Sequence, residues 1–389
     1  MKIYYWTPYM GHVGTIKATI NSAIALKQNG HTVKIYRIHK EWEGYEEILK
    51  KYGIDIIDLG MAKVFPKLLH GRIGFRISMI FVSLYSYSKL KKNWESDRPD
   101  IIMAYLLGYL PIWVRKKSKH KPIIINSIQG KPMFNWFRKW LWNRLYVDSD
   151  QIIVLSEQTQ KDLYQNLRYP KEKIVLLPNP IIDSNMDHMA LEPLEEPYAS
   201  ENVPIILGVG RLTRQKNFET LIKAYNIVRK NYPCCLWILG EGEERERLQN
   251  LINKFQIQNH AKLIGFVSNP YKYMKKADVF VLSSLWEDSG HVLIEAAYMK
   301  MKIVSTRCPS GQEEFLDYGQ RGELCDMQSP ESMAQAIRHM LDHANESQNL
   351  AKTELAYKAA LAYTLEQHGE KMEALLETVR RNTNGIDCL

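Results

Sequence analysis

Short apolar runs alternate with amphipathic stretches along the chain. In the first half, the apolar runs with helical patterns between them are residues 2–6, 32–38, 101–104, 123–126 and 152–154. In the second half, the corresponding runs are residues 205–209, 236–239, 261–264, 279–282 and 303–304. Short β-rich runs separated by helices are typical of a parallel sheet with helices on both faces. The pattern therefore predicts an α/β protein.

The alternation is interrupted near the middle of the chain. Residues 183–204 hold several prolines and acids without a clear period, which is typical of an interdomain linker. A length of 389 residues suits two domains of about 150–200 residues each. We therefore predict two Rossmann-like, doubly wound domains, at 1–182 and 205–355, that face each other across a cleft. The helix-forming residues of 356–389 predict a C-terminal helical segment that packs back on the first domain.

Positive charge is concentrated in the first half. The formal net charge is +9, but residues 1–190 alone carry 29 Lys and Arg against 16 Asp and Glu. Segments 65–92 and 131–146 combine cations with apolar side chains, and the second holds three Trp. Such segments suit either the headgroup zone of an anionic membrane or a core-packed helix with a basic edge. The charge asymmetry favours reversible attachment to an anionic membrane surface or an anionic lipid-linked acceptor. Without a helix-turn-helix, zinc or RNP-type signature, we predict no nucleic-acid binding.

Cysteine spacing and hydropathy indicate the compartment. The five cysteines are odd in number and form no C-x-x-C pair, which predicts core thiols in a reducing environment. The longest uncharged stretches, 77–88 and 101–114, are shorter than the roughly 18 residues that a spanning helix needs. The first residues have a strand pattern rather than that of a signal peptide. We expect a cytoplasmic protein, located peripherally at the inner face of the cytoplasmic membrane.

Candidate chemistry follows the strands of the second half, because doubly wound sheets bind ligands beyond the carboxyl ends of their strands. After run 205–209, Gly210 allows a ligand to approach the backbone, and Arg211 and Lys216 can converge on one diphosphate. A solvated loop with two ordinary basic residues would have the same sequence. The turn at 240–244 contains glycines but is not G-x-G-x-x-G, which disfavours an oxidoreductase that binds a dinucleotide.

A second cluster follows run 279–282. A helix begins near Gly290–Val292, and the dipole and N–H groups of its first turn suit a diphosphate. Glu295 lies about one turn into that helix, where it can accept hydrogen bonds from ribose hydroxyls, and Glu287 precedes the turn, within reach of a sugar ring. Two solvated acids around a helix start are the alternative, which the coincidence with the loop at 210–216 disfavours. The cluster predicts a nucleotide-sugar site that needs no metal.

These motifs together resemble a known enzyme family. Glu287 and Glu295 are separated by seven residues. With the Gly210–Lys216 loop, this spacing resembles the E-x7-E retaining glycosyltransferases of family 4, which have the GT-B fold. Further phrases similar to that family are residues 150–156, 173–180, 265–267 and 277–284. The resemblance covers most of the chain and is strongest over 205–311.

The resemblance implies a role for each matching residue. Domain 1–182 would bind the acceptor, and domain 205–355 would bind the nucleotide-sugar. Arg211 and Lys216 would neutralise the donor diphosphate. Glu295 would hold the ribose, and Glu287 would contact the donor sugar near the reacting carbon. Further contacts to the donor are expected from Gly11, Gly14, Gly210, Phe266, Val267, Gly290, His291 and Val292.

The chain departs from the family pattern at two positions. Gln129 follows the run at 123–126, where many family members carry His. Because Gln cannot act as a base, we expect Gln129 to form a hydrogen bond with the donor sugar. Asp288 occupies a position that is commonly glycine in the family, which leaves the sugar selectivity open.

The resemblance also implies a mechanism, which is front-face attack with retention at the anomeric carbon. In this mechanism the departing phosphate helps to deprotonate the acceptor. Asp148-Ser149-Asp150 matches the D-x-D of metal-dependent transferases, but it precedes a strand rather than forming a catalytic loop. We therefore predict no metal and no cofactor, only a nucleotide-sugar co-substrate, taken to be UDP-linked.

The leading hypothesis is a hexosyl- or N-acetylhexosaminyltransferase that extends a surface glycan such as lipopolysaccharide, O-antigen or capsule. Its acceptor would be a glycan or a lipid-linked glycan. Two alternatives stay open. One is a soluble glycosyltransferase that acts on a small acceptor, and the other is a catalytically silent scaffold that binds a nucleotide-sugar.

Overall fold

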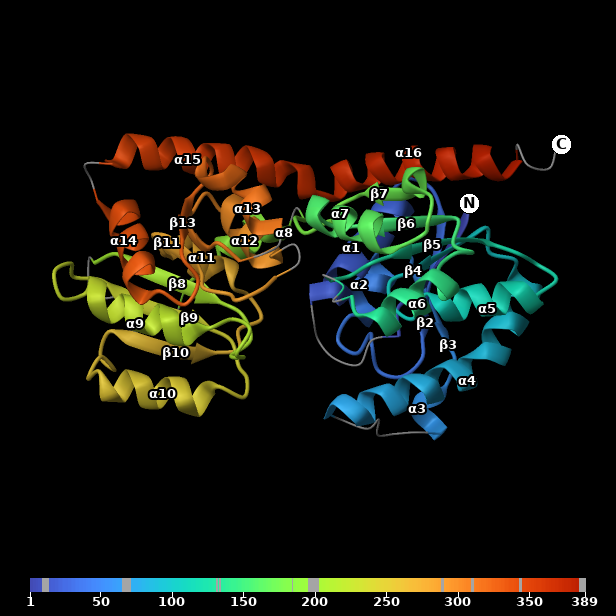
Figure 1. Ribbon diagram of the computed structural model, residues 1–389, viewed down its shortest axis with the longest axis horizontal. Helices are drawn as coiled ribbons and strands as arrows, with labels where there is room; N and C mark the ends of the chain where they lie inside the picture. Colours follow the sequence, from blue (N-terminus) through green and yellow to red (C-terminus); the bar gives the residue numbers. More distant parts are fainter. Residues whose placement is uncertain are drawn as a thin grey trace. The chain divides into compact units, whose positions relative to one another are not determined.

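The computed structural model describes residues 1–8, 14–64, 71–130, 132, 134–183, 185–194, 203–287, 290–308, 311–342 and 345–384. Contacts divide the chain into two compact units (Figure 1). Unit 1 comprises Met1–Pro180 and Leu365–Leu389, and unit 2 comprises Ile181–Thr364. The chain therefore passes between the units at two places, and unit 1 is discontinuous in sequence.

Within the described residues, unit 1 is built on a parallel sheet with the strand order β3-β2-β1-β4-β5-β6-β7. Its strands are β1 (Lys2–Trp6), β2 (Thr32–Arg37), β3 (Asp55–Asp58), β4 (Ile101–Ala104), β5 (Ile123–Ser127), β6 (Gln151–Val154) and β7 (Ile174–Leu176). Its helices are α1 (Gly14–Gln28), α2 (Glu46–Lys51), α3 (Met61–Val64), α4 (Gly71–Asp97), α5 (Tyr109–Lys117), α6 (Trp136–Leu145), α7 (Glu157–Asn166) and α16 (Leu365–Asn384).

Alternate residues of the central strand β1 fill the cores on the two faces of this sheet. Ile3 and Tyr5 pack with α1 and α16, whereas Tyr4 and Trp6 pack with α4 and α5. Helices α6 and α7 cover the same face as α4 and α5, over β6. Because successive side chains of a strand point to opposite faces, a strand covered on both sides is apolar throughout. This explains the apolar run at the start of the chain.

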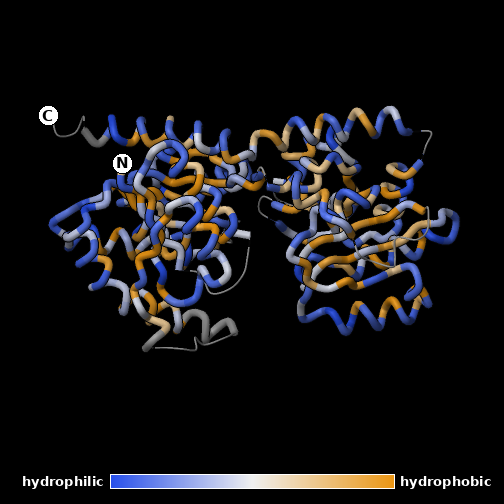
Figure 2. Tube along the Cα trace, turned by 180° about the vertical axis from the view of Figure 1, so that it is seen from behind, coloured by the Kyte–Doolittle hydropathy of each residue, from blue (hydrophilic) through white to orange (hydrophobic). Residues whose placement is uncertain are grey.

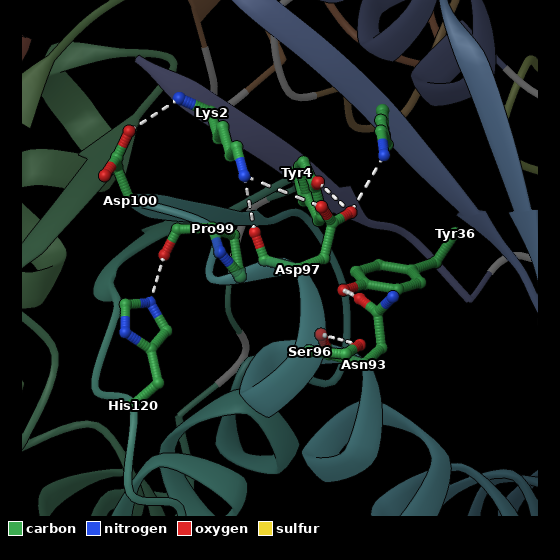
Figure 3. A network of polar contacts seen from close by, with 10 residues as sticks. Lys2, Tyr4, Tyr36, Asn93, Ser96, Asp97, Pro99, Asp100 and His120 are labelled. Carbon is green, nitrogen blue, oxygen red and sulfur yellow. Dashed lines mark hydrogen bonds and ion pairs between the residues drawn. The ribbon is translucent and has the colours of Figure 1, made fainter.

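A polar network ties the end of α4 to β1 and β2 (Figure 3). The Tyr4 hydroxyl donates a hydrogen bond to Asp97, and Lys34 Nζ lies 2.8 Å from the same carboxylate. Burial raises the pKa of Tyr4 to about 12, and the hydrogen bonds from Lys34 and Tyr4 lower the pKa of Asp97. Lys2 Nζ also donates to the backbone carbonyl of Asp97, at 2.7 Å. Since α4 ends just before β4 begins, the network lies at the amino edge of the sheet, away from the edge that binds ligands.

Unit 2 repeats the architecture, with the strand order β10-β9-β8-β11-β12-β13 among its described residues. Its strands are β8 (Ile205–Val209), β9 (Cys235–Leu239), β10 (Ala261–Gly265), β11 (Val279–Leu282), β12 (Lys302–Thr306) and β13 (Glu323–Cys325). Its helices are α8 (Asn185–Ala190), α9 (Phe218–Val228), α10 (Arg245–Lys254), α11 (Tyr271–Lys276), α12 (His291–Tyr298), α13 (Gly311–Phe315), α14 (Pro330–Leu341) and α15 (Glu346–Ala360). Helices α9 and α14 cover one face of the sheet, and α11, α12 and α15 cover the other.

The distribution of hydropathy follows this layering. Figure 2 shows mainly apolar strands in each unit and covering helices that alternate between apolar and polar along their length. Among the described helices, none combines the length and the apolarity that are needed to cross a bilayer.

The two parallel α/β units confirm the predicted fold class. The apolar runs used for the prediction coincide with strands, but β3, β7 and β13 are not predicted by them. These three strands have only three or four residues each, and β3 reads Asp-Ile-Ile-Asp, with a charged residue at each end. Charged residues interrupt the apolar pattern of β3 and β13, whereas β7 is as apolar as the predicted run at 152–154.

Part of the expected linker is structured. Helix α8 lies within residues 183–204, and its Met186 is fully buried in a core cluster of unit 2. The expected C-terminal segment, 356–389, is divided between the units, because 356–364 complete unit 2 whereas α16 packs against α1 in unit 1. A six-residue helix such as α8 is too short to show a period in the sequence.

The cysteines of the described residues are buried free thiols, as expected from their spacing. They are Cys234, Cys235, Cys308 and Cys325. Burial raises the pKa values of Cys234 and Cys325 to about 12, so both side chains are protonated near neutral pH. Cys388 lies outside the described residues.

Helix α16 is held on unit 1 by a buried histidine. His368 is 3% exposed, and its Nδ1 lies 3.0 Å from the carbonyl oxygen of Pro178. Its Nε2 lies 2.9 Å from the Ser22 hydroxyl, which is also 2.9 Å from the Tyr5 hydroxyl. A neutral imidazole satisfies both contacts, donating through Nδ1 and accepting at Nε2. Burial lowers the pKa of His368 to about 4.

This burial makes the stability of unit 1 depend on pH. The folded-state pKa lies below the unfolded value of about 6.5, so the stabilisation is present above pH 6.5 and is lost as the pH falls towards 4. Relative to His368→Asn, we expect wild-type unfolding free energy to fall by up to roughly 3 kcal/mol between pH 7 and pH 4. Urea unfolding at several pH values measures this difference. The exposed His188→Asn substitution serves as the control, and parallel wild-type and His368→Asn profiles would contradict the prediction.

Candidate functional site

Glycines at the carboxyl edge of the unit 2 sheet bring the ends of three strands into contact. The Gly210 N–H donates to Leu239 O at 3.0 Å, and the Gly240 N–H donates to Gly265 O at 2.7 Å. A β-carbon on residue 240 would lie 1.9 Å from the Gly210 carbonyl oxygen, and Gly240 has a φ of +139°. Only glycine fits this position, because it combines a positive φ with no side chain. The loops after β8, β9 and β10 are therefore held side by side.

Lys216 lies across the end of β8 and contacts an acid in the loop after β11. A β-carbon on Gly210 would be 3.0 Å from Lys216 Cε, so the lysine side chain runs directly over the glycine. Its ammonium forms an ion pair with Glu287 Oε1, which also accepts a 2.6 Å hydrogen bond from the Ser284 hydroxyl. The Lys216 and Glu287 side chains are only 17% and 11% exposed. Two of the predicted site residues, 71 positions apart, thus meet at the sheet edge.

Further hydrogen bonds join the loop after β8 to the loop after β11. The Ser283 hydroxyl donates to the Lys216 carbonyl at 2.7 Å. The Leu285 N–H donates to Gln215 O at 2.8 Å, and the Gln215 side chain donates to the Trp286 carbonyl at the same distance. These contacts fix the backbone on both sides of the ion pair, so that the charged groups are held in place by the loops that carry them.

Helix α12 begins beside this pair. Gly290 is its N-cap, in the left-handed conformation with φ 57° and ψ 54°, and His291 and Val292 form its first turn. The positive end of the helix dipole therefore lies at the carboxyl edge of the sheet. Glu295, in the next turn, accepts a 2.9 Å hydrogen bond from the Tyr271 hydroxyl of α11. Residues 288 and 289 lie outside the described residues.

Arg211 and the loop after β10 lie at the exposed rim of this edge. Arg211 is exposed, and its guanidinium has no ion-pair or hydrogen-bond partner among the described residues. Phe266 directly follows β10 and is 78% exposed, whereas Val267 packs against a core cluster. The predicted residues of unit 2 thus share one edge of its sheet, with Lys216 and Glu287 shielded and Arg211 and Phe266 accessible.

The predicted residues of the first half belong to unit 1. Gly14 is the first residue of α1, and Gly11 lies outside the described residues. Gln129 follows β5, and its side-chain amide donates to the Ser127 hydroxyl at 2.7 Å and accepts from Asn179 at 2.9 Å. Both ends of the Gln129 amide are therefore engaged inside unit 1.

The two carboxylates of the Asp148-Ser149-Asp150 segment form ion pairs within unit 1. Asp150 forms an ion pair with Arg115 and accepts a 2.7 Å hydrogen bond from the Ile124 N–H. Asp148 lies 2.5 Å from Lys116 Nζ. The carboxylates of this segment thus fasten the end of α5 to the start of β6.

The structure adds three polar residues that the motifs did not indicate. Ser284 contacts Glu287, Gln215 joins the two loops, and Tyr271 contacts Glu295. Ser284 could have been predicted from its position, since it lies between the apolar residues of β11 and the acidic loop that follows. Tyr271 carries no such signal, because its contact with α12 depends on how two helices pack.

Two family descriptions match the chain. "Glycosyltransferase Family 4" matches residues 16–184, and "Glycosyl transferases group 1" matches residues 192–355. The first falls almost entirely in unit 1 and the second entirely in unit 2. The first match begins after β1, and the second includes every described strand of unit 2.

The relatives are named as glycosyltransferases. N-acetylgalactosamine-N,N'-diacetylbacillosaminyl-diphospho-undecaprenol 4-alpha-N-acetylgalactosaminyltransferase of Campylobacter jejuni is 30% identical over 273 residues, which are 68% of this chain and 72% of that protein. Lipopolysaccharide core biosynthesis glycosyltransferase LpsE of Rhizobium meliloti is 31% identical over 155 residues, 40% of this chain and 43% of that protein. For some relatives, therefore, the chain spans less than half of their length.

Solved structures share the fold. The crystal structure of Anabaena Alr3699/HepE in complex with UDP-glucose has a TM-score of 0.76 and 15% sequence identity, and the match covers 97% of this chain and all of that one. At this identity the likeness concerns the fold alone, and it supports the GT-B type of the two units. Together with the Campylobacter relative, the matches establish that the chain belongs to the family 4 glycosyltransferases.

The contact between Gly240 and Gly210 predicts a severe effect for a small substitution. In Gly240→Ala, the new methyl group would overlap the Gly210 carbonyl, so we expect unfolding free energy to fall by about 2 kcal/mol more than in Gly319→Ala. Gly319 is the control because it also has a positive φ, of 107°, but has nothing within 4 Å of its β-carbon position. Urea unfolding measures both variants, and equal losses would show that the backbone contact is not restrictive.

Proposed function

We propose that the chain is a retaining glycosyltransferase that moves a sugar from a UDP-linked donor to a surface glycan or lipid-linked acceptor. The observation that carries the proposal is the shielded pair of Lys216 and Glu287, held at the sheet edge beside the start of α12 in a family 4 glycosyltransferase. Cations and a helix start at one edge of a doubly wound sheet suit a diphosphate.

Each residue of this edge has a proposed part in donor binding. Lys216 carries three donor protons, so it can hold Glu287 and a phosphate oxygen together. Arg211 is accessible and would complete the neutralisation of the diphosphate. Glu295, oriented by Tyr271, would accept hydrogen bonds from the ribose, and Glu287 would contact hydroxyls of the donor sugar.

The proposed reaction retains the configuration of the anomeric carbon. The acceptor hydroxyl oxygen bonds to this carbon as the bond from the carbon to the β-phosphate oxygen breaks. The electron pair of that bond leaves with the nucleoside diphosphate, and the acceptor proton passes to the departing phosphate oxygen. Preorganised positive groups lower the barrier because negative charge grows on the leaving diphosphate. Lys216, Arg211 and the first turn of α12 would supply these groups, without a metal.

The relatives support the donor and acceptor classes. The Campylobacter enzyme is named for a diphospho-undecaprenol acceptor and an N-acetylgalactosaminyl group, and the Anabaena structure contains UDP-glucose. By analogy, we propose a hexosyl or N-acetylhexosaminyl unit as the transferred sugar. A catalytically silent scaffold is the second candidate, and turnover separates it from the enzyme.

The donor site is tested by removing its cation. We expect UDP to raise the melting temperature of the wild type, and Lys216→Ala to weaken UDP binding and to slow hydrolysis of the matching UDP-sugar at least tenfold. Glu295→Ala should weaken binding of UDP more than binding of inorganic diphosphate, because the ribose contact is lost. Lys223→Ala is the control, since Lys223 forms an ordinary ion pair with Glu219 on α9. Thermal-shift assays with UDP-, GDP- and dTDP-sugars and product chromatography give the readouts.

Three results would count against the proposal in different ways. Equal rates for the wild type and Lys216→Ala would reject the site. Binding of a nucleotide-sugar without turnover, with or without acceptor, would favour the scaffold. A clear preference for GDP- or dTDP-sugars would replace the proposed UDP.

We also propose that unit 1 attaches reversibly to an anionic membrane surface. None of the described residues of α6 is buried, and its Trp136 and Trp140, one turn apart, are 80% and 54% exposed. Phe137 stacks with Trp140, with ring centroids 6.1 Å apart. The helix carries three cations and no acid. Exposed aromatic rings among cations suit the headgroup zone of anionic lipids.

Vesicle co-sedimentation tests the attachment. We expect the wild type to bind vesicles that contain phosphatidylglycerol, less strongly at high salt, and Trp136→Ser with Trp140→Ser to weaken binding about tenfold. Leu350→Ser with Leu355→Ser removes two exposed apolar residues of α15 and should leave binding unchanged. Absence of salt-sensitive binding would instead favour a transferase that acts on a small, soluble acceptor.

A further inference from the structure

The first helix of unit 2 packs against the helices of the candidate donor site. It belongs to the α8 segment, residues 185–194, which follows shortly after the boundary between the two units. Met186 and Ala190 of this segment share a core cluster with residues of α11 and α12 (Figure 1). Helix α12 carries Glu295, the proposed ligand of the ribose. The α8 segment and the ribose ligand are therefore connected through one core cluster.

Asn269 joins the α8 segment to α11 by hydrogen bonds. It is 6% exposed and lies in the loop between β10 and α11. Its Nδ2 donates to the Met189 carbonyl at 2.7 Å and to Glu192 Oε2 at 2.8 Å. Its Oδ1 accepts from the Tyr271 N–H at 3.0 Å. The two N–H groups of the amide thus bind the α8 segment, and its oxygen binds α11.

Tyr271 extends this connection to the ribose ligand. It is the first residue of α11, is 4% exposed, and donates from its hydroxyl to Glu295 Oε1 at 2.9 Å. The backbone of Tyr271 is therefore bonded to Asn269, while its hydroxyl is bonded to Glu295. Because protein interiors are close-packed, the buried ring has little room to reorient. A shift of the Tyr271 backbone is therefore passed on to the Glu295 carboxylate.

The orientation of this carboxylate decides which ribose hydroxyls it can bind. A carboxylate has about four acceptor positions, so Glu295 can keep the bond from Tyr271 and also accept from hydroxyls. Hydrogen bonds weaken steeply when their angle falls below about 120°. A small rotation of Glu295 therefore weakens the ribose contact and leaves the diphosphate contacts of Lys216 unchanged.

A second hydrogen bond joins the α8 segment to α12 itself. The Tyr298 hydroxyl donates to Asp187 Oδ2 at 3.0 Å, and Tyr298 is the last residue of α12, one turn after Glu295. The α8 segment is thus bonded both to the helix that carries the ribose ligand and to the loop before the tyrosine that orients it.

We propose that Asn269 is a positioning residue for the donor ribose. Through Tyr271 it sets the orientation of Glu295, and it thereby couples the α8 segment to recognition of the ribose hydroxyls. The inference rests on the proposed function, because it concerns the support of the ribose contact in that site. Coupling between two sites is reciprocal, so a bound ribose should in turn stabilise the α8 segment.

Deoxygenated nucleotides test the positioning. UDP, 2′-deoxy-UDP and 3′-deoxy-UDP share the base and the diphosphate, so the ratio of their dissociation constants in calorimetric titrations isolates the hydroxyl contacts. We expect the wild type to prefer UDP over at least one deoxy form by tenfold or more, as for a hydrogen bond to a charged group. Tyr271→Phe and Asn269→Asp should each reduce this preference at least threefold. Asn269→Asp keeps an oxygen for the Tyr271 N–H but has no N–H for the α8 segment.

Glu192→Ala is the variant that leaves the folded core intact, because Glu192 is exposed. It removes a partner of Asn269 in the α8 segment and should also reduce the preference at least threefold. Lys272→Ala is the matched control. It removes a 3.4 Å contact with the Pro193 carbonyl of the same segment, does not touch Asn269, and should keep the preference within twofold.

A double variant separates positioning from a merely structural role. In Tyr271→Phe, a further Glu192→Ala should cause no additional loss of preference, because the hydroxyl that transmits the effect is already absent. A structural role would lower the melting temperature and weaken all three nucleotides equally. An unchanged preference in both Asn269→Asp and Glu192→Ala, or an equal loss from Glu192→Ala with and without the Tyr271 hydroxyl, would overturn the proposal.

Hydrogen exchange tests the reciprocal effect. With each nucleotide at saturation, the amides of 185–194 should exchange more slowly with UDP than with the deoxy form that binds more weakly. Equal exchange would overturn the coupling of the α8 segment to the ribose.

The Glu295→Ala variant keeps failure of this inference apart from failure of the proposed function. If Glu295→Ala abolishes the preference for UDP while Asn269→Asp, Glu192→Ala and Tyr271→Phe retain it, only the positioning role fails. If the wild type does not bind UDP, or Glu295→Ala keeps the full preference, the proposed ribose contact fails and the inference fails with it.

Discussion

The candidate donor site depends on a backbone contact that leaves no room for a side chain. The Gly210 carbonyl occupies the space that a β-carbon on residue 240 would take, so β8 and β9 can end side by side only with glycine there. This contact sets the path of the loop after β8, and Lys216 then passes over Gly210 to meet Glu287. Removing one partner of a shielded ion pair leaves the charge of the other partner buried and unpaired. The geometry of the charges thus follows from the packing of the loops.

In unit 1, helix α6 lies at the surface instead of in the core. None of the described residues of α6 is fully buried, and Trp142 packs against the edge of a core cluster of unit 1. Asn135 caps it by accepting a hydrogen bond from the Arg138 N–H at 2.8 Å, and Trp142 packs edge-on against Phe134 at 5.3 Å between ring centroids. Trp142 faces a core cluster of unit 1, whereas Trp136 and Trp140 are left open to solvent. A helix that serves only the core would bury these two rings.

The sequence was sufficient for the fold class and for the loops that carry the donor residues. Strands that are buried on both faces, such as β1, can be recognised in the sequence because every position is apolar. The contact between Lys216 and Glu287 cannot be predicted from local spacing, because it requires β8 and β11 to be neighbours in the sheet although β9 and β10 lie between them in sequence order. The hydrogen bond between Gln129 and Asn179 could not be predicted either, because the two residues are 50 positions apart in the sequence. Local pattern gives the elements, and contacts distant in sequence give the site.

The discontinuity of unit 1 imposes an order on folding during synthesis. Met372, Leu376 and Val379 of α16 share a core cluster with Ile20 and Ile24 of α1. While the ribosome translates the whole of unit 2, this surface of α1 has no cover, since its partner has not yet been made. Unit 2 is continuous and can close first, whereas unit 1 must wait for a helix encoded about 340 codons after α1. The nascent chain therefore carries this uncovered apolar surface until α16 has been made.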